Sequence, residues 1–168
     1  MTLVIGGAGY TVSQSDIVNN FSNETGMSQQ DAKKYVEDAQ GDLESFSKIG
    51  QDFIDDGTQV MNTVSQVDCA NYTYGWETST LSCDQGVIQM KTVGNDEISL
   101  GNCYKSLGSD LGQESRTKIS ECIGDIDAVN ADYMLPVVTA LLDHNQITES
   151  KNANSYNKSV LQAALNSH

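Results

Sequence analysis

Basic residues, histidine and proline are scarce in this sequence. It has 9 lysine and arginine residues against 23 aspartates and glutamates, which gives a formal net charge of −14. A negative potential of this size repels phosphate groups, so we expect no sequence-independent binding to nucleic acid and no contact with an anionic membrane face. No apolar run approaches the ~20 residues that span a bilayer. The charge is compatible with a basic protein partner.

Motifs that carry chemistry are also missing. The sequence has no phosphate-binding or dinucleotide-binding glycine motif and no nucleophile elbow. The two histidines, His144 and His168, lie at a predicted helix end and at the chain terminus, where solvated histidines are common. The acidic stretch 52–57 has Ile54 where a calcium loop needs an oxygen ligand, and Thr63 where it needs an acid. We therefore expect no turnover chemistry, no metal and no cofactor.

The composition nevertheless predicts a folded core. Hydrophobic residues make up 38% of the 168 residues and charged residues 19%, outside the range of disordered chains. The length fits one compact domain of roughly 100–200 residues. We divide the chain into an apolar, glycine-rich tail (residues 1–12), a helical region (13–67), a β segment (68–108) and a second helical region (109–168) that packs on the first.

The tail at residues 1–12 has no lysine or arginine ahead of its apolar stretch. An ordinary secretory signal peptide carries a basic region there, so we expect either that a leader has been removed or that export uses another route. A tail of this composition can insert into a membrane or into a partner's groove. The simpler interpretation, which we favour, is a tail that lies on the protein's own surface.

The four cysteines, Cys69, Cys83, Cys103 and Cys122, lie in the middle of the chain. Their even number within a segment rich in glycine, asparagine and threonine predicts disulfides and an oxidising compartment, either extracellular or in a virion. None of them lies close enough in sequence to another for a typical zinc-ligand pair. Of the three possible pairings we expect Cys69–Cys83 and Cys103–Cys122, because short loops close most easily. The alternative is four buried thiols in a cytosolic protein.

Two helices are predicted near the N-terminus. Residues 11–26 show apolar positions at helical spacing, with Ser13 or Ser15 as the N-cap and Gly26 as the C-cap. Ser28 starts the second helix, where Asp31 replaces the glutamate of a capping box.

The segment 13–38 contains Glu24-Thr-Gly-Met-Ser28 followed by Asp31-Ala-Lys33. It resembles the N-terminal helix pair of the HU/IHF histone-like proteins. In that family the helix pair supports dimerisation, while basic β-arms elsewhere in the chain hold DNA. The family's glycine-phenylalanine strand motif and basic arm have no counterpart here. The resemblance therefore implies helix–turn–helix packing and no DNA-binding residue.

A seven-residue repeat of apolar residues follows. It comprises Ala32, Ala39, Phe46, Phe53, Val60 and Val67. Such a repeat keeps one seam of a helix turned toward the same partner. Gly41, Gly50 and Gly57 lie within it, each costing about 1 kcal/mol relative to alanine in a helix, and Gly57 is the expected break. We predict that the seam packs against a helix at 119–133 and against the segment 137–142.

Residues 68–108 are predicted to form a small antiparallel β segment. The stretches 71–76 and 87–93 are rich in β-branched and aromatic residues, and Gly94 and Asn95 between apolar stretches predict a hairpin turn. This segment also holds a cluster of aromatic residues, which are typical anchors of protein interfaces or, alternatively, the centre of a small satellite core. They are Tyr72, Tyr74 and Trp76.

The C-terminal third is predicted to be helical again. Apolar positions from about Gln113 to Tyr133 recur at three- and four-residue steps, and Pro136 should restart a buried helix that ends near His144. A polar loop then precedes a short amphipathic helix that begins near Tyr156.

Three carboxylates in this third, Asp125, Asp127 and Asp132, fit a weak cation site. They fit a water-exposed helix face equally well.

The sequence thus predicts an α+β protein that is mainly α, with a helical bundle, a long heptad-patterned helix and a disulfide-pinned antiparallel β insert. The expected function is that of a non-catalytic structural or assembly subunit, in a virion or an extracellular assembly, that binds a protein partner or itself. One alternative is an acidic inhibitor or immunity-type module that masks a basic partner. Another is a helical membrane-active protein that uses the apolar N-terminus.

Overall fold

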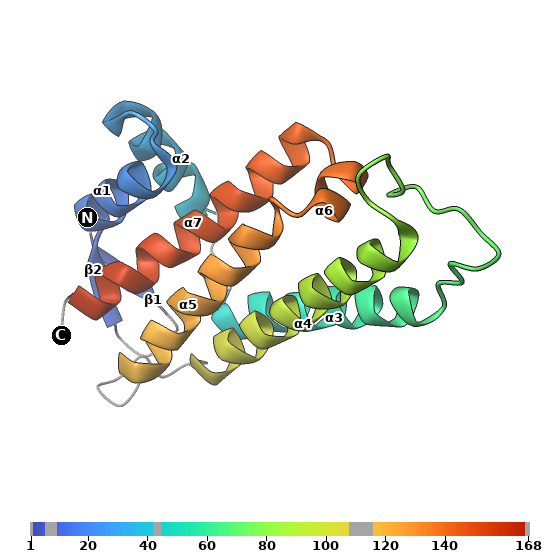
Figure 1. Ribbon diagram of the computed structural model, residues 1–168. Coiled ribbons are helices and arrows are strands. Elements are labelled where there is room, and N and C mark those ends of the chain that lie inside the picture. Colours follow the sequence, from blue (N-terminus) through green and yellow to red (C-terminus); the bar gives the residue numbers. More distant parts are fainter. Residues whose placement is uncertain (1, 6–9, 42–44, 108–115, 167–168) are drawn as a thin grey trace.

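The computed structural model describes residues 2–5, 10–41, 45–107 and 116–166. Within them it contains seven helices and one two-stranded sheet (Figure 1). The elements are β1 (Thr2–Ile5), β2 (Tyr10–Ser13), α1 (Gln14–Thr25), α2 (Gln29–Gly41), α3 (Phe46–Ser65), α4 (Cys83–Leu107), α5 (Arg116–Asp132), α6 (Pro136–Leu141) and α7 (His144–Asn166). The mainly α prediction is confirmed, and no helix of the described residues is long and apolar enough to cross a membrane.

The N-terminal segment forms a hairpin rather than the predicted tail. β1 and β2 pair antiparallel, with Leu3 opposite Val12. Both strands are rich in β-branched residues, which favour extended backbone. Val12 is buried in the main core, and β2 contacts α7. The hairpin is therefore docked on the helical body.

α1 and α2 form the predicted helix pair. Gly26 ends α1 with a φ of 75°, a conformation that glycine adopts without strain. The Ser28 hydroxyl accepts a hydrogen bond from the backbone N–H of Asp31 at 3.1 Å and caps α2. Phe21 and Tyr35 stack with ring centroids 4.6 Å apart. This is the helix–turn–helix packing that the resemblance implied, while the family relationship itself stays a prediction.

The predicted β insert is wrong. Residues 66–82 form turns and irregular structure, and residues 83–107 form the single helix α4, where strands and a hairpin turn at Gly94 and Asn95 were expected. The β-branched residues suggested strands, but the buried positions of α4 recur at helical steps, such as Leu100, Tyr104 and Leu107. Tertiary packing overrides a local β preference in this segment.

α3 and α4 lie antiparallel and touch through two glycine pairs (Figure 1). A Cβ atom added to Gly50 would lie 2.5 Å from the carbonyl oxygen of Gly101, and one added to Gly57 would lie 2.7 Å from that of Gly94. Only glycine allows this close backbone approach. Gly57 is therefore a packing residue, and the helix break expected there is wrong, because α3 continues to Ser65.

The heptad seam is divided between two helices. α2 ends at Gly41 and α3 begins at Phe46, so the repeat does not lie on one long helix. The seam was expected to pack on the helix at 119–133, but the main partner of α3 is α4, which in turn packs on α5. Phe46 still reaches the main core, because it stacks on Tyr104 of α4 at 5.4 Å between ring centroids.

α7 is longer than predicted. Residues 144–166 form one helix, where a polar loop and a short helix from Tyr156 were expected. Two of its buried polar residues have partners, since Asn154 donates a hydrogen bond to Asn130 of α5 at 3.0 Å and Ser159 donates to a carbonyl oxygen one turn back. Pro136 begins α6 as predicted, in a position where its missing N–H has no cost.

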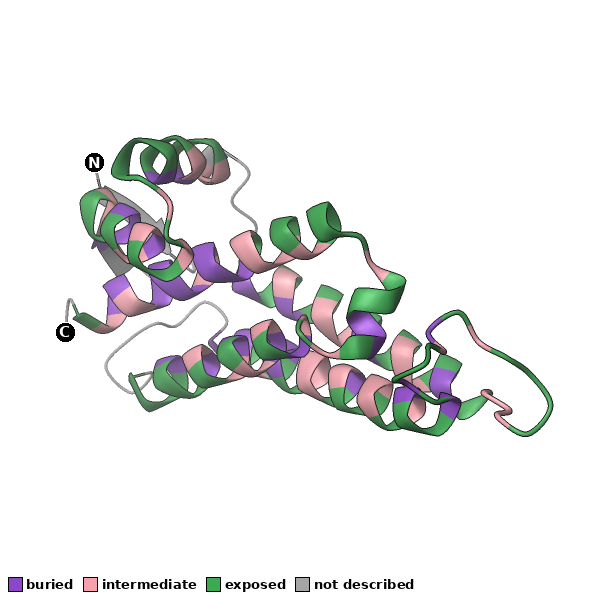
Figure 2. Ribbon diagram, turned by 45° about the horizontal axis from the view of Figure 1, so that its top comes forward, coloured by how far each residue is buried: buried purple, intermediate pink, exposed green. Residues whose placement is uncertain are grey.

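Two separate clusters of buried residues hold the molecule together. The main core joins α1, α2, α5 and α7 to the adjoining parts of α3 and α4. The second cluster lies at the opposite end from the two termini, where residues 66–90 and 133–147 meet, and we call this end the tip (Figure 1). Figure 2 shows buried positions gathered along α7, whereas the 66–82 loop is largely exposed.

Each region contains one disulfide. Cys103–Cys122 ties α4 to α5 beside the main core, and Cys69–Cys83 ties the tip loop to the start of α4. Both pairings agree with the prediction. The two disulfides indicate an oxidising, extracellular-type compartment.

Candidate functional site

The tip loop is ordered by aromatic packing and by one disulfide. The Tyr74 hydroxyl accepts a hydrogen bond from the backbone N–H of Asp68 at 2.8 Å. Tyr74 also stacks on Trp76, with ring centroids 5.0 Å apart. Trp76 lies directly against Gly86 of α4, where no larger residue fits. These contacts hold an otherwise irregular loop in one conformation.

The short helix α6 completes the tip. The side chain of Gln89 on α4 accepts a hydrogen bond from the backbone N–H of Val137 at 3.0 Å, which satisfies a donor at the start of α6. Val137 and Val138 are buried with Trp76 and Leu81 in the second cluster. A six-residue helix can bury only one side, so its other side faces solvent.

The tip is also where large apolar side chains are exposed. Among the side chains of residues 12–40, 45–107 and 116–166, four large apolar ones are exposed, and all four belong to the tip. They are Tyr72 (66% exposed), Ile88 (66%), Met134 (70%) and Leu141 (47%). Single exposed apolar residues are common on any protein, but their restriction to one end is not explained by chance exposure. We call these four residues the apolar tip surface.

The three predicted interface aromatics all lie in the tip. Only Tyr72 is presented to solvent, while Tyr74 is half-buried and Trp76 is 6% exposed. Trp76 thus contributes to the satellite core, the alternative that the sequence left open. Sequence reasoning missed Ile88, which it assigned to a strand, and Met134, which it assigned to a buried helix. Pro136 was the available signal for Met134, because a helix that this proline restarts begins after Met134.

A second feature is a groove of about 600 Å³ lined by residues of α2, α3, α4 and α7 and by Tyr133. We call it the central groove. Its aromatic lining residues are Tyr35, Phe46, Phe53, Tyr133 and Tyr156. A smaller apolar cavity of about 200 Å³ shares Glu97 and Tyr133 with it and extends toward α6.

Carboxylates that have no basic partner lie where the central groove meets the smaller cavity. One carboxylate oxygen of Glu97 and one of Asp132 are buried with no hydrogen-bond partner among the described residues. Burial raises the pKa of Glu97 to about 7, and the nearby charge of Asp56 adds to the effect. Burial, together with a hydrogen bond that the protonated Asp132 carboxyl donates to Asp96, raises the pKa of Asp132 to about 7.

The predicted trio Asp125, Asp127 and Asp132 does not form one site. Asp132 lies with Asp96 and Glu97, whereas Asp127 binds a lysine on α7. Within the part of the chain that the structure describes, no group of three or more histidine, cysteine or acidic residues can hold a metal ion.

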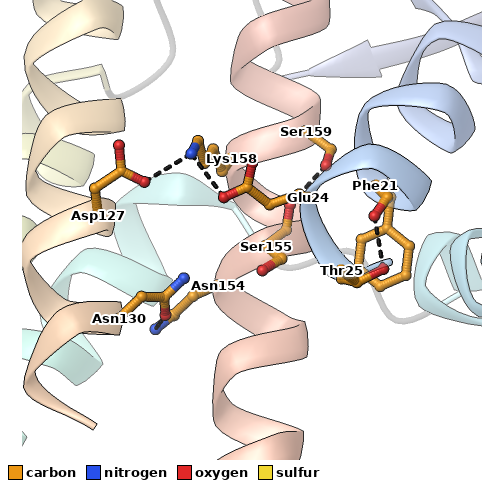
Figure 3. Close-up of polar contacts among 9 residues, drawn as sticks. All are labelled: Phe21, Glu24, Thr25, Asp127, Asn130, Asn154, Ser155, Lys158 and Ser159. Atoms are coloured by element: carbon orange, nitrogen blue, oxygen red, sulfur yellow. Dashed lines mark hydrogen bonds and ion pairs between the residues drawn. The ribbon is translucent and has the colours of Figure 1, made fainter. Parts of the chain in front are cut away.

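That lysine, Lys158, forms the molecule's other polar centre (Figure 3). Its Nζ atom lies 2.7 Å from Glu24 of α1 and 2.7 Å from Asp127 of α5. Burial alone would lower the pKa of Lys158, but the hydrogen bonds and charges of its two acidic partners outweigh burial, and the pKa is raised. We call this group the Lys158 triad, and it links three helices.

The chain matches no family model, no curated protein and no solved structure.

Proposed function

We propose that this protein is a non-catalytic structural subunit of an extracellular or virion assembly, and that it associates with a second copy of itself through the tip. The observation that carries the proposal is the restriction of exposed large apolar side chains to the tip. Aromatic and methionine side chains are typical of the centre of protein interfaces. All four residues belong to the segments 66–90 and 133–147 that pack on the tip core, which supports the surface.

The expected association is weak. Burial of one such half-exposed side chain stabilises by on the order of 1–2 kcal/mol. Four side chains from each of two copies give a gross gain of roughly 8–16 kcal/mol, which exceeds the ~4–15 kcal/mol that association costs by only a few kcal/mol. A dissociation constant in the micromolar range or weaker follows. Such contacts suit a subunit that is held by many neighbours at once.

Charge opposes self-association in any arrangement, and a tip-to-tip contact limits the repulsion. Two copies that carry −14 each repel one another. Contact through the tips keeps the remaining acidic surfaces of the two copies far apart, because the tip lies opposite the end with the two termini (Figure 1). Added salt screens the remaining repulsion, so self-association should strengthen as the salt concentration rises.

Sedimentation velocity of the intact, oxidised chain tests this proposal. Over a range of roughly 10–500 µM we expect a concentration-dependent larger species that grows with salt. The double variant Met134→Ser and Leu141→Ser should weaken association at least fivefold, because both side chains are exposed and neither is needed by the fold. A matched control, Gln29→Ser with Gln30→Ser, changes two exposed residues at the other end.

A single monomeric species at every concentration and salt level would overturn the proposal. Self-association that the Met134→Ser and Leu141→Ser variant leaves unchanged would do the same, because the contact would then lie elsewhere.

The acidic inhibitor remains the second candidate, because carboxylates also surround the tip. Asp68, Glu77, Asp84 and Asp143 lie in its segments 66–90 and 133–147, which contain no lysine or arginine. A basic partner would be attracted to this end, and its binding would weaken with added salt, which is the opposite of the dependence expected for self-association. Titration with a lysine-rich amphipathic peptide at two salt concentrations separates the two candidates.

A further inference from the structure

The central groove has the size and lining of a small-molecule site. Its volume of about 600 Å³ falls within the range of pockets that bind drug-sized ligands. Five aromatic side chains from α2, α3 and α7 and from the end of α5 line it. Aromatic faces attract cations that approach within about 6 Å of the ring centre. The walls therefore favour an apolar body that carries a positive charge.

The polar side of the groove lacks a counter-ion. Asp56 and Glu97 line it, and no lysine, arginine or histidine of the described residues does. One oxygen of Glu97 is buried and has no hydrogen-bond partner among those residues. A buried polar atom normally has a partner, and a buried carboxylate without one is costly. Elsewhere in the same molecule Lys158 lies within 2.7 Å of two carboxylates and neutralises them.

Tyr156 provides an independent indication of a ligand. It lines the groove and is only 7% exposed, yet its hydroxyl has no hydrogen-bond partner in the described part of the chain. Tyr35 lies beside it, with ring centroids 6.4 Å apart. A buried hydroxyl oxygen can accept a hydrogen bond from an ammonium N–H. Two residues that line the groove, one on α4 and one on α7, thus each contain a buried acceptor without a partner.

We propose that the central groove binds a hydrophobic organic cation, an ammonium group carried on an aromatic or alkyl body. Glu97, with Asp56 beside it, is the counter-ion, the five aromatic rings enclose the apolar body, and the Tyr156 hydroxyl accepts a hydrogen bond. An anion would be repelled by the two carboxylates. A neutral apolar ligand would leave Glu97 without a partner. The central groove shares no lining residue with the apolar tip surface, so binding there does not depend on the proposed self-association.

The adjoining 200 Å³ cavity extends the site for longer ligands. Its lining is mostly aliphatic, with valines from α3, α4, α5 and α6, and it meets the central groove at Glu97 and Tyr133. Asp132, which is 8% exposed, contributes a second buried oxygen without a partner there. An alkyl chain attached to the ammonium fits this cavity better than a polar substituent.

Isothermal titration calorimetry on the intact, oxidised protein tests the proposal. The probe is 2-phenylethylammonium at pH 8, where the carboxylate of Glu97 is ionised. The comparison ligands of similar shape are 2-phenylethanol, which is neutral, and phenylacetate, which is an anion. We expect saturable binding of the ammonium, at least tenfold weaker binding of the alcohol and none of the carboxylate. Benzyltrimethylammonium tests whether the aromatic rings hold a cation that donates no hydrogen bond.

Two variants locate the site. Glu97→Gln keeps the shape and removes the charge, and it should weaken binding of both cations about tenfold or more. Tyr156→Phe should weaken binding of 2-phenylethylammonium by a few fold and leave benzyltrimethylammonium unchanged, because only the former donates a hydrogen bond. Asp38→Asn, an exposed carboxylate on α2 that lines neither cavity, is the matched control and should bind as the parent does.

Three results would overturn the proposal. One is an absence of saturable binding by both cations. Another is equal affinity for the ammonium and the alcohol, which would show that charge is not recognised. The third is full binding by a folded Glu97→Gln variant, with folding checked by its thermal unfolding. None of these results depends on the oligomeric state, so a failure here is distinguishable from a failure of the tip proposal.

Discussion

The two ends of this molecule are stabilised in different ways. At the end with the termini, nineteen buried residues of the described chain form one core that includes parts of six helices. At the tip, five buried residues form the second cluster, supported by a six-residue helix and an irregular loop. A core this small buries too little apolar surface to fix a loop by itself, and the Cys69–Cys83 disulfide supplies the missing constraint.

The two ends therefore differ in role, because the large core stabilises the fold while the tip exposes apolar side chains. The large core buries its big apolar side chains almost completely, whereas the tip holds Tyr72, Ile88, Met134 and Leu141 at the surface. A covalent crosslink lets the tip keep these side chains exposed without relying on them for its own stability. The tip is therefore the part of the described chain that is best suited to contact another protein.

The largest effect should come from a truncation in the main core. Phe46→Ala removes a buried ring that stacks on Tyr104, and it should lower the free energy of unfolding by about 3–5 kcal/mol. Chemical denaturation of both proteins measures the loss. Leu81→Ala, in the tip core, is the comparison and should cost less, because the tip can open without the main core. A loss below about 1 kcal/mol for Phe46→Ala would contradict the bundle described here.

Removal of the disulfides should show the contrast between the ends most directly. The sequence separations of 14 and 19 residues are similar, so chain entropy predicts a similar loss of about 3 kcal/mol for each pair. Replacement of Cys103 and Cys122 by serine should lower global stability. The same change at Cys69 and Cys83 should instead remove hydrogen-exchange protection from residues 66–90 alone.

Non-reducing mass spectrometry of the native protein should first find two disulfides. Four alkylatable thiols would contradict both pairings and the oxidising compartment. Equal loss of protection throughout the chain after removal of Cys69–Cys83 would show that the tip is not a separate unit.

A smaller effect is expected at the Lys158 triad, which belongs to the end with the termini. Lys158→Met should lower the free energy of unfolding by about 1–3 kcal/mol, less than for a fully buried ion pair, because Glu24 and Asp127 are partly exposed and can be hydrated. Lys33→Met, in the exposed pair with Glu37, is the control and should cost less than about 0.5 kcal/mol. Equal effects of the two substitutions would mean that the triad does not stabilise the helix junction.

Local signals in the sequence predicted the helix caps, the proline restart and the disulfide pairing. Gly26 and Ser28 act within one turn of the chain, and Pro136 fixes its own backbone, so neighbouring residues determine these features. The cysteine pairing followed from loop length. Helical content in the C-terminal third followed from apolar spacing.

The sequence misled where tertiary contacts decide the structure. Glycine is typical of helix breaks and turns, and Gly57 and Gly94 were interpreted in this way. The two residues instead lie against each other where two helices pack. Asn154 was assigned to a loop because its hydrogen-bond partner, Asn130, lies on α5, far away in sequence. For the same reason the groove around Glu97 could not be predicted, since its lining comes from five separate segments.

The smallest effect concerns pH and Glu97, which lines both the central groove and the cavity that reaches α6. The pKa of Glu97 rises from its usual 4.5 to about 7 in the folded protein, so between these values the folded state holds a proton that the unfolded state has released. The stability that Glu97 contributes therefore falls as the pH rises from about 4.5 to 7 and is constant above that range.

Glu97→Gln removes this dependence. After allowance for solvent screening, the variant should gain about 1–2 kcal/mol over the parent between pH 4 and pH 8. Denaturation at both pH values measures the gain, and Asp38→Asn should show none. Because Asp132 has a raised pKa as well, part of the parent's slope should persist in the variant. A variant whose stability follows the parent's at every pH would show that Glu97 is exposed to water, and the region between the two ends would then be an ordinary solvated surface.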